Sequence, residues 1–333
     1  MQRLKKYIAL PIIIILILLG FFIRIDYFLI TPSRAVELGG IIEVENRDLN
    51  DLGTFYLVTV SQQRASLITA LYGVMHPHID LNPIASVIPA NMDESEYRQL
   101  LSENMIESRH LAQVVALRRV GYEVEINSEG VQIVGLTDNA PAEGTLFEND
   151  LILAIDGCPV FLATEVPLLV QGREVGEAVN LTISRNGERV DLAINTGANP
   201  EDLELPYLGI YVRTLPWEPV LPVNIEMDTG RIGGPSAGLM FVLEIMNQLL
   251  EDDLTKGLKI AGTGTIDINE NVGRIGGVVQ KVITAERAGA DYFLVPRGNY
   301  EQARKVARRI EVIAVDNLEE ALAFLASVES PSF

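Results

Sequence analysis

Ser236 is the residue of this chain best placed to act as a nucleophile. It lies in a glycine-rich turn, GRIGGPSAG, directly before an apolar helix, so backbone N–H groups lie beside its hydroxyl. A serine held in this way is able to attack a carbonyl group while neighbouring N–H groups stabilise the oxyanion. Two simpler interpretations are a helix N-cap and a phosphate-binding turn. No GxxxxGK[ST] or GxGxxG pattern occurs in this turn, which disfavours nucleotide binding.

Lys281 has the position expected of a general base. It lies on a helix that begins near Val278 and shares the apolar side of that helix with Val278 and Ala285. Charged side chains are rarely fully buried, and burial lowers the pKa of an amine. A neutral amine can accept the proton of a serine hydroxyl where no histidine serves. The alternative is a surface lysine whose ammonium group reaches past the apolar stripe into water.

Few residues remain for other chemistry. The chain has three histidines, His76, His78 and His110, and one cysteine, Cys158. A single cysteine excludes a disulfide framework and a cysteine-based zinc site, so we expect no metal and no cofactor. His110 lies in a helical pattern and is interpreted as a solvated or capping residue, but it is the first alternative base if Lys281 is not one.

The composition limits the class of protein. A length of 333 residues fits two or three domains, and 48% hydrophobic residues provide packed cores. The formal net charge of −19 argues against a nucleic-acid-binding surface, which needs a basic patch.

The N-terminal segment is predicted to be a membrane anchor. Tyr7–Ile23 is 17 residues long and uncharged, which corresponds to about 25 Å of helix, and Ile25–Ile30 could lengthen it. Arg3, Lys5 and Lys6 precede this run, so the N-terminus is expected in the cytoplasm and the body outside the cell membrane. A cleaved signal peptide is the alternative, but bulky residues follow where a small-x-small cleavage site would lie.

The remaining pattern indicates a mixed α and β protein. Helical spacing predicts a long helix over 93–119, and 64–72 is typical of a short one. Short runs of β-branched residues separated by tight turns characterise 121–197, where Asn186-Gly187 predicts a hairpin. Other expected strands are 53–60, 131–136, 151–155, 208–212, 223–227 and 291–298.

The segment 121–197 resembles a PDZ domain of the bacterial protease type. The resemblance is carried by NAPAEGTLFENDLILAIDGCPV, in which Asn149 replaces the glycine usual before Asp150. PDZ domains bind extended peptides by adding a strand to a sheet edge, so peptide binding is expected here. The alternative is that the segment is only a spacer.

GGPSAG and IGGVVQK resemble the two signatures of the Lon-type serine–lysine endopeptidases. The resemblance implies that Ser236 is the nucleophile, Lys281 the general base and Thr263 a hydrogen-bonding partner of the lysine. It also implies an oxyanion site formed by backbone N–H groups from Gly234 to Ala237. Thr265 departs from the family, which often has glutamate there.

Upstream segments resemble other parts of the same protease domain. GTFYLVTV and MIESRHLAQVVALRRVGY are similar to its earlier strand and helix, so the PDZ unit is expected to interrupt a split protease domain. An independent N-terminal segment is the alternative.

Together these features resemble the membrane-anchored PDZ–Lon proteases, which include SepM-like pheromone-processing proteases. The resemblance implies an α+β protein with an N-terminal transmembrane helix, a β-rich PDZ domain and a Lon-type proteolytic α/β domain. The expected parts are an anchor (1–30), a stalk with the first part of the protease region (31–120), the PDZ domain (121–197) and the Lon-type domain (198–330).

The implied function is an ATP-independent, single-pass membrane-anchored serine endopeptidase. It would cleave exported peptides or flexible protein segments presented by the PDZ domain. Its partners would be that substrate and the lipid bilayer, with no nucleic acid or nucleotide, and a homo-oligomer remains compatible. The alternative function is a non-catalytic PDZ scaffold tethered to the membrane.

Overall fold

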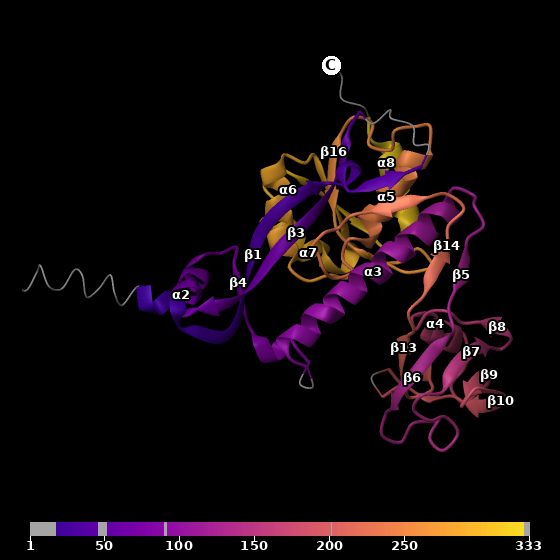
Figure 1. Ribbon diagram of the computed structural model, residues 1–333. Helices are drawn as coiled ribbons and strands as arrows, with labels where there is room; N and C mark the ends of the chain where they lie inside the picture. The colour runs from indigo at the N-terminus through magenta and orange to yellow at the C-terminus, as the bar shows by residue number, and fades with distance from the viewer. Residues whose placement is uncertain (1–17, 46–51, 90–91, 201, 330–333) are drawn as a thin grey trace, which may run out of the picture. The chain divides into compact units, whose positions relative to one another are not determined.

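The computed structural model describes residues 18–45, 52–89, 92–200 and 202–329 (Figure 1). The chain forms two compact units, and each is described by itself. Unit 1 combines Met1–Tyr122 with Val223–Phe333, and unit 2 is Glu123–Pro222.

Unit 1 contains a six-stranded sheet with the order β20-β19-β16-β3-β1-β4. Its strands are β1 (Arg24–Glu37), β3 (Thr54–Ser66), β4 (Asp80–Pro83), β16 (Lys259–Gly262), β19 (Tyr292–Pro296) and β20 (Glu311–Val315). β3, β16, β19 and β20 run parallel, whereas β1 pairs antiparallel with both β3 and β4. Because β3 precedes unit 2 and β16 follows it, one sheet joins the two parts of unit 1.

The helices of unit 1 are α2 (Leu67–Met75), α3 (Glu94–Arg119), α5 (Gly238–Leu249), α6 (Val278–Ala288), α7 (Tyr300–Val306) and α8 (Leu318–Ser327). Helices cover both faces of the sheet, whereas α3 packs on α5 and α2 lies at the distal end of β1 and β3. Side chains alternate along β3, so Tyr56 and Val58 pack in one cluster with residues of α6 and α7. Phe55 and Leu57 are buried on the opposite face, and α5 contacts β3, β16 and α3. α5 is therefore enclosed almost completely, which fixes the residues just before it.

Charged and polar residues at its ends stabilise α3. The Asp93 carboxylate accepts hydrogen bonds from the backbone N–H groups of Ser95 and Glu96, and the Glu96 carboxylate accepts one from the Asp93 N–H. Arg118 and Arg119 lie in the last turn, where positive charge is favourable. The helix predicted over 93–119 is confirmed.

Near the N-terminus the structure differs from the sequence-based expectation. Ile25–Ile30 belong to β1 and pair with β3 and β4, so the prediction that they lengthen an apolar helix is wrong. Strand pairing satisfies their backbone groups. Residues 18–22 are helical, and the rest of the expected anchor, residues 1–17, lies outside the described residues. Among the residues that the structure does describe, no helix has both the length and the apolar composition needed to cross a bilayer.

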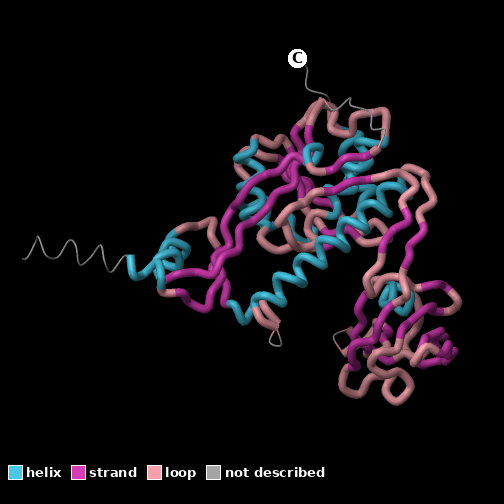
Figure 2. Tube along the Cα trace, viewed as in Figure 1, coloured by secondary structure: helices cyan, strands magenta, loops and turns pink. Residues whose placement is uncertain are grey.

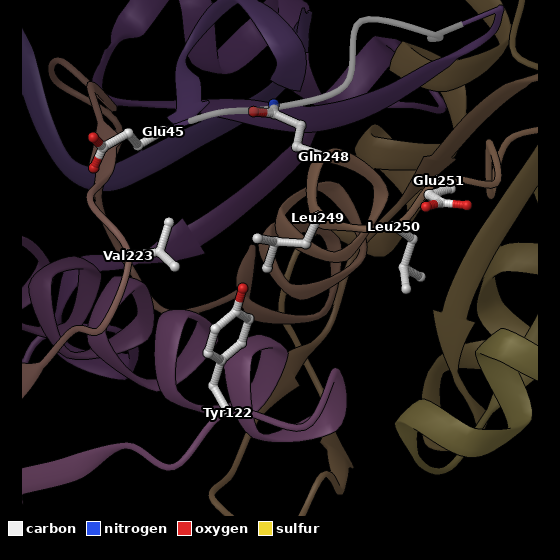
Figure 3. A pocket seen from close by; sticks show the side chains of 7 residues that line it. All are labelled: Glu45, Tyr122, Val223, Gln248, Leu249, Leu250 and Glu251. Carbon is white, nitrogen blue, oxygen red and sulfur yellow. The ribbon is translucent and has the colours of Figure 1, made fainter.

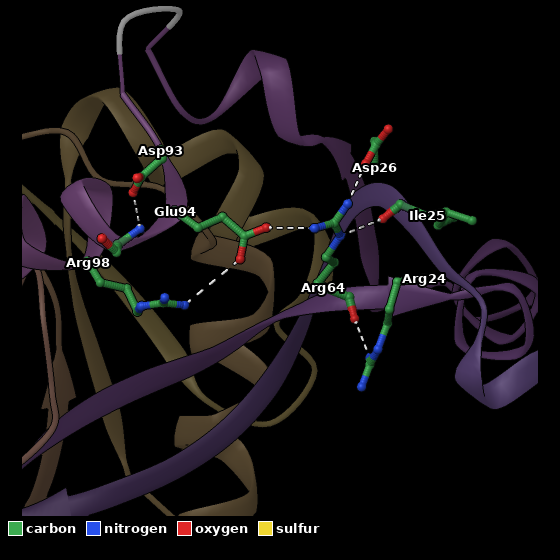
Figure 4. A network of polar contacts seen from close by, with 8 residues as sticks. Arg24, Ile25, Asp26, Arg64, Asp93, Glu94 and Arg98 are labelled. Atoms are coloured by element: carbon green, nitrogen blue, oxygen red, sulfur yellow. Dashed lines mark hydrogen bonds and ion pairs between the residues drawn. The ribbon is translucent and has the colours of Figure 1, made fainter.

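Beyond the end of β16, β1 and β3 continue as a ribbon, drawn in magenta in Figure 2, and β4 joins β1 at its distal end. β16 pairs with β3 only over Thr54–Leu57, so the distal part of β3 pairs with β1 alone. At the distal end α2 begins with a capping box between Ser66 and Thr69. A polar network around Arg64 lies at the base of α2 (Figure 4).

Unit 2 is built on a sheet with the order β10-β9-β7-β6-β13. Its strands are β6 (Val131–Leu136), β7 (Leu151–Ile155), β9 (Ala178–Arg185), β10 (Glu188–Asn195) and β13 (Ile210–Thr214), and its helix is α4 (Glu165–Gln171). β13 pairs antiparallel with β6, and short pairs join β11 (Gly197–Ala198) to β12 (Pro206–Tyr207) and β5 (Glu125–Asn127) to β14 (Glu218–Val220). The structure therefore places 198–222 in unit 2, whereas the expected boundary assigned this segment to the protease domain.

Turn residues in unit 2 explain two features of its sequence. Asn186 and Gly187 have φ values of 54° and 84° and join β9 to β10, so the predicted hairpin is confirmed. Asn149 has φ 71°, a left-handed conformation that asparagine tolerates better than most residues. The replacement of glycine at position 149 therefore preserves the turn before β7.

We expect Asp150→Asn to lower the free energy of unfolding of unit 2 by about 2 kcal/mol. Asp150 is buried and binds Arg185, whose side chain is 30% exposed, so the loss should be smaller than for a fully buried ion pair. Burial alone would raise the pKa of Asp150, but hydrogen bonds from Arg185 and Phe147 hold the pKa below its usual 3.8. This stabilisation is present above the pKa of the unfolded chain and is lost as the pH falls through the folded pKa.

Chemical denaturation followed by the fluorescence of Trp217, the single tryptophan, measures this effect between pH 7 and pH 3. Glu188→Gln, which removes an exposed carboxylate on β10, is the matched control. Parallel stability curves for Asp150→Asn and the parent would contradict the assignment.

Candidate active site

The turn before α5 presents Ser236 at the edge of the enclosed helix. Gly234 has φ 85°, a conformation that favours glycine, and Ala237 is the N-cap residue of α5. Ser236 is half-buried, whereas Ala237 is 1% exposed. The hydroxyl is therefore accessible on a turn whose backbone is fixed.

The buried amine of Lys281 contacts this hydroxyl. Lys281 lies in the first turns of α6 and is only 3% exposed, as its place on the apolar stripe predicted. Its Nζ donates hydrogen bonds to Ser236 Oγ at 2.7 Å and to Thr263 Oγ1 at 2.8 Å. The structure thus brings together three residues that are far apart in the sequence.

Thr263 connects the lysine to the serine turn. It follows β16 directly and is fully buried. Its hydroxyl accepts a hydrogen bond from Lys281 and donates one to the Ser236 carbonyl oxygen at 2.9 Å. The Gly264 N–H donates to the same carbonyl at 2.9 Å. Thr263 therefore sets the distance between the serine backbone and the amine. Thr265 lies in the short strand β17 (Thr265–Ile266) and pairs with Gly273 of β18 (Val272–Gly273).

Burial gives Lys281 a neutral amine near neutral pH. Desolvation by the surrounding core disfavours the ammonium form and lowers the pKa of Lys281 from 10.5 to about 7. Near neutral pH a large fraction of the amine is thus unprotonated. A group of this pKa, hydrogen-bonded to a serine hydroxyl, can act as its general base.

Helix α3 holds the serine turn through two bonds that sequence reasoning did not identify. Ser108 Oγ donates to the Pro235 carbonyl oxygen at 3.1 Å, and the Gly234 N–H donates to the Leu101 carbonyl oxygen at 2.7 Å. Ser108 is 3% exposed, which is uncommon for a serine on a helix. A serine within an otherwise apolar helical stripe was the available signal.

These bonds modify the expected oxyanion site. The Gly234 N–H is already occupied by Leu101, and Pro235 has no N–H to donate. Within the predicted segment Gly234–Ala237, the donors that remain are the N–H groups of Ser236 and Ala237. The role of Gly234 is therefore to shape the turn and attach it to α3.

Ser108→Ala should reduce kcat by about tenfold with little change in KM, because the turn loses one of its two bonds to α3 while the substrate contacts remain. Ser102→Ala, which changes an exposed serine on the same helix, is the control and should leave both constants unchanged. Steady-state cleavage of an unstructured peptide separates the two constants. An increase in KM alone would show that Ser108 acts on substrate binding instead.

The remaining candidate residues lie outside this group. His110 lies on α3, and the amine that is hydrogen-bonded to Ser236 belongs to Lys281. His76 and His78 contact each other in the segment after α2, with ring centroids 5.6 Å apart. In the described ranges no three His, Cys, Asp or Glu side chains are grouped so that they could hold a metal ion.

A cavity of about 220 Å³ lies elsewhere in unit 1 (Figure 3). It is lined by Glu45, Tyr122, Val223, Gln248, Leu249, Leu250 and Glu251. Gln248 is held in its wall by bonds to the backbone of Ile42 and Val44. Neither Ser236 nor Lys281 lines this cavity, so it is not the space in which the serine would meet a substrate.

Two protein families match this chain. Residues 223–327 match the Lon protease (S16) C-terminal proteolytic domain, and residues 118–196 match the PDZ domain. Both resemblances noted in the sequence are thereby confirmed. The Lon match contains Ser236, Thr263 and Lys281, and its residues belong to unit 1.

Curated relatives show the same two kinds of similarity. Lon protease 2 of Herpetosiphon aurantiacus is 32% identical over 117 residues, which are 33% of this chain and 14% of that protein. Lon protease 2 of Bacillus subtilis is 34% identical over 91 residues, which are 27% of this chain and 16% of that protein. A probable periplasmic serine endoprotease DegP-like of Pseudomonas putida is 39% identical over 74 residues, 22% of this chain and 16% of that protein.

The chain spans less than a fifth of the length of each of these relatives. Each match covers only 22–33% of this chain, about the size of one domain. The chain thus carries a Lon-type proteolytic domain of the serine peptidase class together with a PDZ domain, the combination of a PDZ–Lon-type protease.

Proposed function

We propose that this protein is a serine endopeptidase that cleaves peptides or flexible protein segments without ATP. The observation that carries the proposal is the contact of 2.7 Å between the buried Lys281 amine and the Ser236 hydroxyl. A lysine buried at this position costs stability, and its contact with a serine hydroxyl supports a chemical role for the amine. The Lon-type match over 223–327 supports the same reaction class.

The geometry suggests the order of steps. Ser236 Oγ attacks the scissile carbonyl carbon, and Lys281 Nζ accepts the hydroxyl proton. The tetrahedral oxyanion is stabilised by the N–H groups of Ser236 and Ala237. Lys281 then donates the proton to the leaving amine, and a water molecule, deprotonated by the same amine, hydrolyses the acyl-enzyme. Thr263 keeps the amine oriented toward the hydroxyl throughout.

In this proposal the PDZ domain binds an extended segment of the substrate by strand addition. A flexible ligand bound by strand addition fits an enzyme that acts on short peptides or unfolded tails. The uncharged run Tyr7–Ile23 supports attachment to the cell membrane, and Arg3, Lys5 and Lys6 support an N-terminus in the cytoplasm with the body outside.

The test uses the full purified chain and a set of unstructured peptides, with and without ATP. The parent should cleave between internal residues and be labelled by a serine-directed phosphonate, and ATP should change neither result. Ser236→Ala should lose both activities, while Ser102→Ala keeps them. Cleavage that persists in Ser236→Ala, or that requires ATP, would contradict the proposal. Protease added to intact, wall-stripped cells should digest the body, and protection until lysis would reverse the proposed orientation.

A further inference from the structure

Apolar side chains face outward at the distal end of the β1–β3 ribbon, where Figure 1 shows α2. The sequence of α2 is LITALYGVM and contains no charged residue. Its buried residues are the two smallest, Ala70 and Gly73. Leu71, Val74 and Met75 are 60%, 76% and 77% exposed, which is the reverse of a helix that packs its apolar face on a core.

Residues 18–23 extend this surface. The Leu67 N–H donates to the Ile23 carbonyl oxygen at 3.1 Å, and Gly20 lies against Ile68. We call the combined surface the apolar tip, and its exposed large side chains are Leu18, Leu19, Phe21, Phe22, Ile23, Tyr27, Leu67, Leu71, Tyr72, Val74 and Met75. They are eleven of the fourteen large apolar side chains that the described part of unit 1 exposes, so the clustering is not random scatter.

Charged groups begin directly behind the apolar tip (Figure 4). Arg64 binds Asp26 at 2.5 Å and Glu94 at 3.2 Å, and Arg24 donates to the Arg64 carbonyl oxygen. The exposed large side chains of the apolar tip are all uncharged, and the Arg64 ion pairs lie next to them. Tyr72 also contacts His76, with ring centroids 5.4 Å apart in a tilted arrangement.

We propose that the apolar tip is embedded in the interfacial layer of a lipid bilayer. The uncharged run Tyr7–Ile23 leads directly into the tip, so a bilayer that held this run would lie against α2. Exposed apolar side chains next to the charged Arg64 cluster match the depth profile of that layer. This contact rests on the proposed membrane attachment and is independent of peptidase activity. Because the tip lacks a basic patch, the contact should be insensitive to salt and to anionic lipid.

The test places an environment-sensitive fluorophore on the tip of the full chain. Cys158→Ser removes the single, exposed cysteine, and Leu71→Cys or Met75→Cys then carries a nitrobenzoxadiazole label. Gln302→Cys on α7, an exposed site far along the chain, is the control. The protein is reconstituted into phosphatidylcholine vesicles with or without a lipid that bears a nitroxide near the headgroup.

Labels at positions 71 and 75 should shift to shorter emission wavelength and lose intensity with the nitroxide lipid, at low and high salt alike. The label at 302 should stay in its aqueous state. Absence of quenching at 71 and 75, or failure of the protein to float with the vesicles, would overturn the proposal. A label shielded from aqueous iodide but not quenched by the lipid would instead indicate contact with a second copy, and would also overturn it.

Peptide cleavage by the same preparations separates this inference from the proposed function. Vesicle-bound protein that cleaves peptide while its tip labels remain aqueous would refute only the lipid contact. Quenched labels in a protein that cleaves nothing would refute only the peptidase.

Discussion

Lys281→Arg should be as inactive as Lys281→Ala, with kcat/KM lowered by roughly 10²- to 10⁴-fold, the usual contribution of general acid–base catalysis. Arginine retains positive charge at this position but stays protonated in proteins, so it cannot accept the proton of Ser236. Combining either substitution with Ser236→Ala should cause no further loss, because the two side chains act as one unit. Lys305→Arg, on the exposed side of α7, is the matched control.

The pH dependence of the parent supports the same test. Only the neutral amine is a base, so kcat/KM should rise with pH through a single ionisation, with a midpoint near the lowered pKa of Lys281, about 7. The measurement is the initial rate of peptide cleavage from pH 5 to pH 9. Substantial activity in Lys281→Arg would show that the lysine contributes only charge, and His110 would be the next candidate. A rate that still rises at pH 9 without reaching a plateau would show that burial does not lower the pKa of the base.

Lys281→Met should unfold at a higher denaturant concentration than the parent even though it is inactive. The folded chain holds the amine at a pKa of about 7 and the unfolded chain at 10.5, a difference that corresponds to at most about 5 kcal/mol at ~1.36 kcal/mol per pH unit. Methionine does not bear this cost but loses the bonds to Ser236 and Thr263. We therefore expect a gain of about 1–3 kcal/mol at pH 6.

The sign of the pH effect distinguishes this explanation from better packing. Between pH 7 and 10.5 the unfolded parent binds a proton that the folded parent does not, so the stability of the parent rises with pH in this window. The advantage of Lys281→Met should consequently be largest at and below pH 7 and shrink toward pH 10. Guanidinium denaturation followed by circular dichroism at pH 6 and pH 9.5 measures it, with Lys305→Met as control. An advantage that is equal at both pH values would contradict the desolvation argument.

Much of the site was predictable because its signals are local. Glycines before Ser236 indicate a tight turn, and the spacing of Lys281 along an apolar stripe indicates burial. The bonds from Ser108 and Leu101 could not be predicted, since they depend on how a helix far away in the sequence packs against α5. The same is true of the occupied Gly234 N–H, which reduced the expected oxyanion donors.

The errors in the fold have a related origin. Ile25–Ile30 follow the uncharged run after one charged residue, Arg24, and a short, largely apolar segment does not reveal whether it is strand or helix. These residues form a strand because they pair with β3, about 35 residues later in the chain. The segment 198–222 was assigned to the wrong unit because its partner, β6, lies roughly 75 residues earlier in the chain.

The pairing of β3 with β16 determines when during synthesis the peptidase can become active. Phe55 pairs with Ile260, and roughly 200 residues separate them in the chain. The parallel pair therefore cannot form until that long segment has been synthesised. Unit 2 is complete once Pro222 has been added, and domains generally fold as units while the chain is still growing. Ser236 and Lys281 are both added later than that. A nascent chain can thus present a folded PDZ domain while it is still unable to cut anything, including itself or a neighbouring chain.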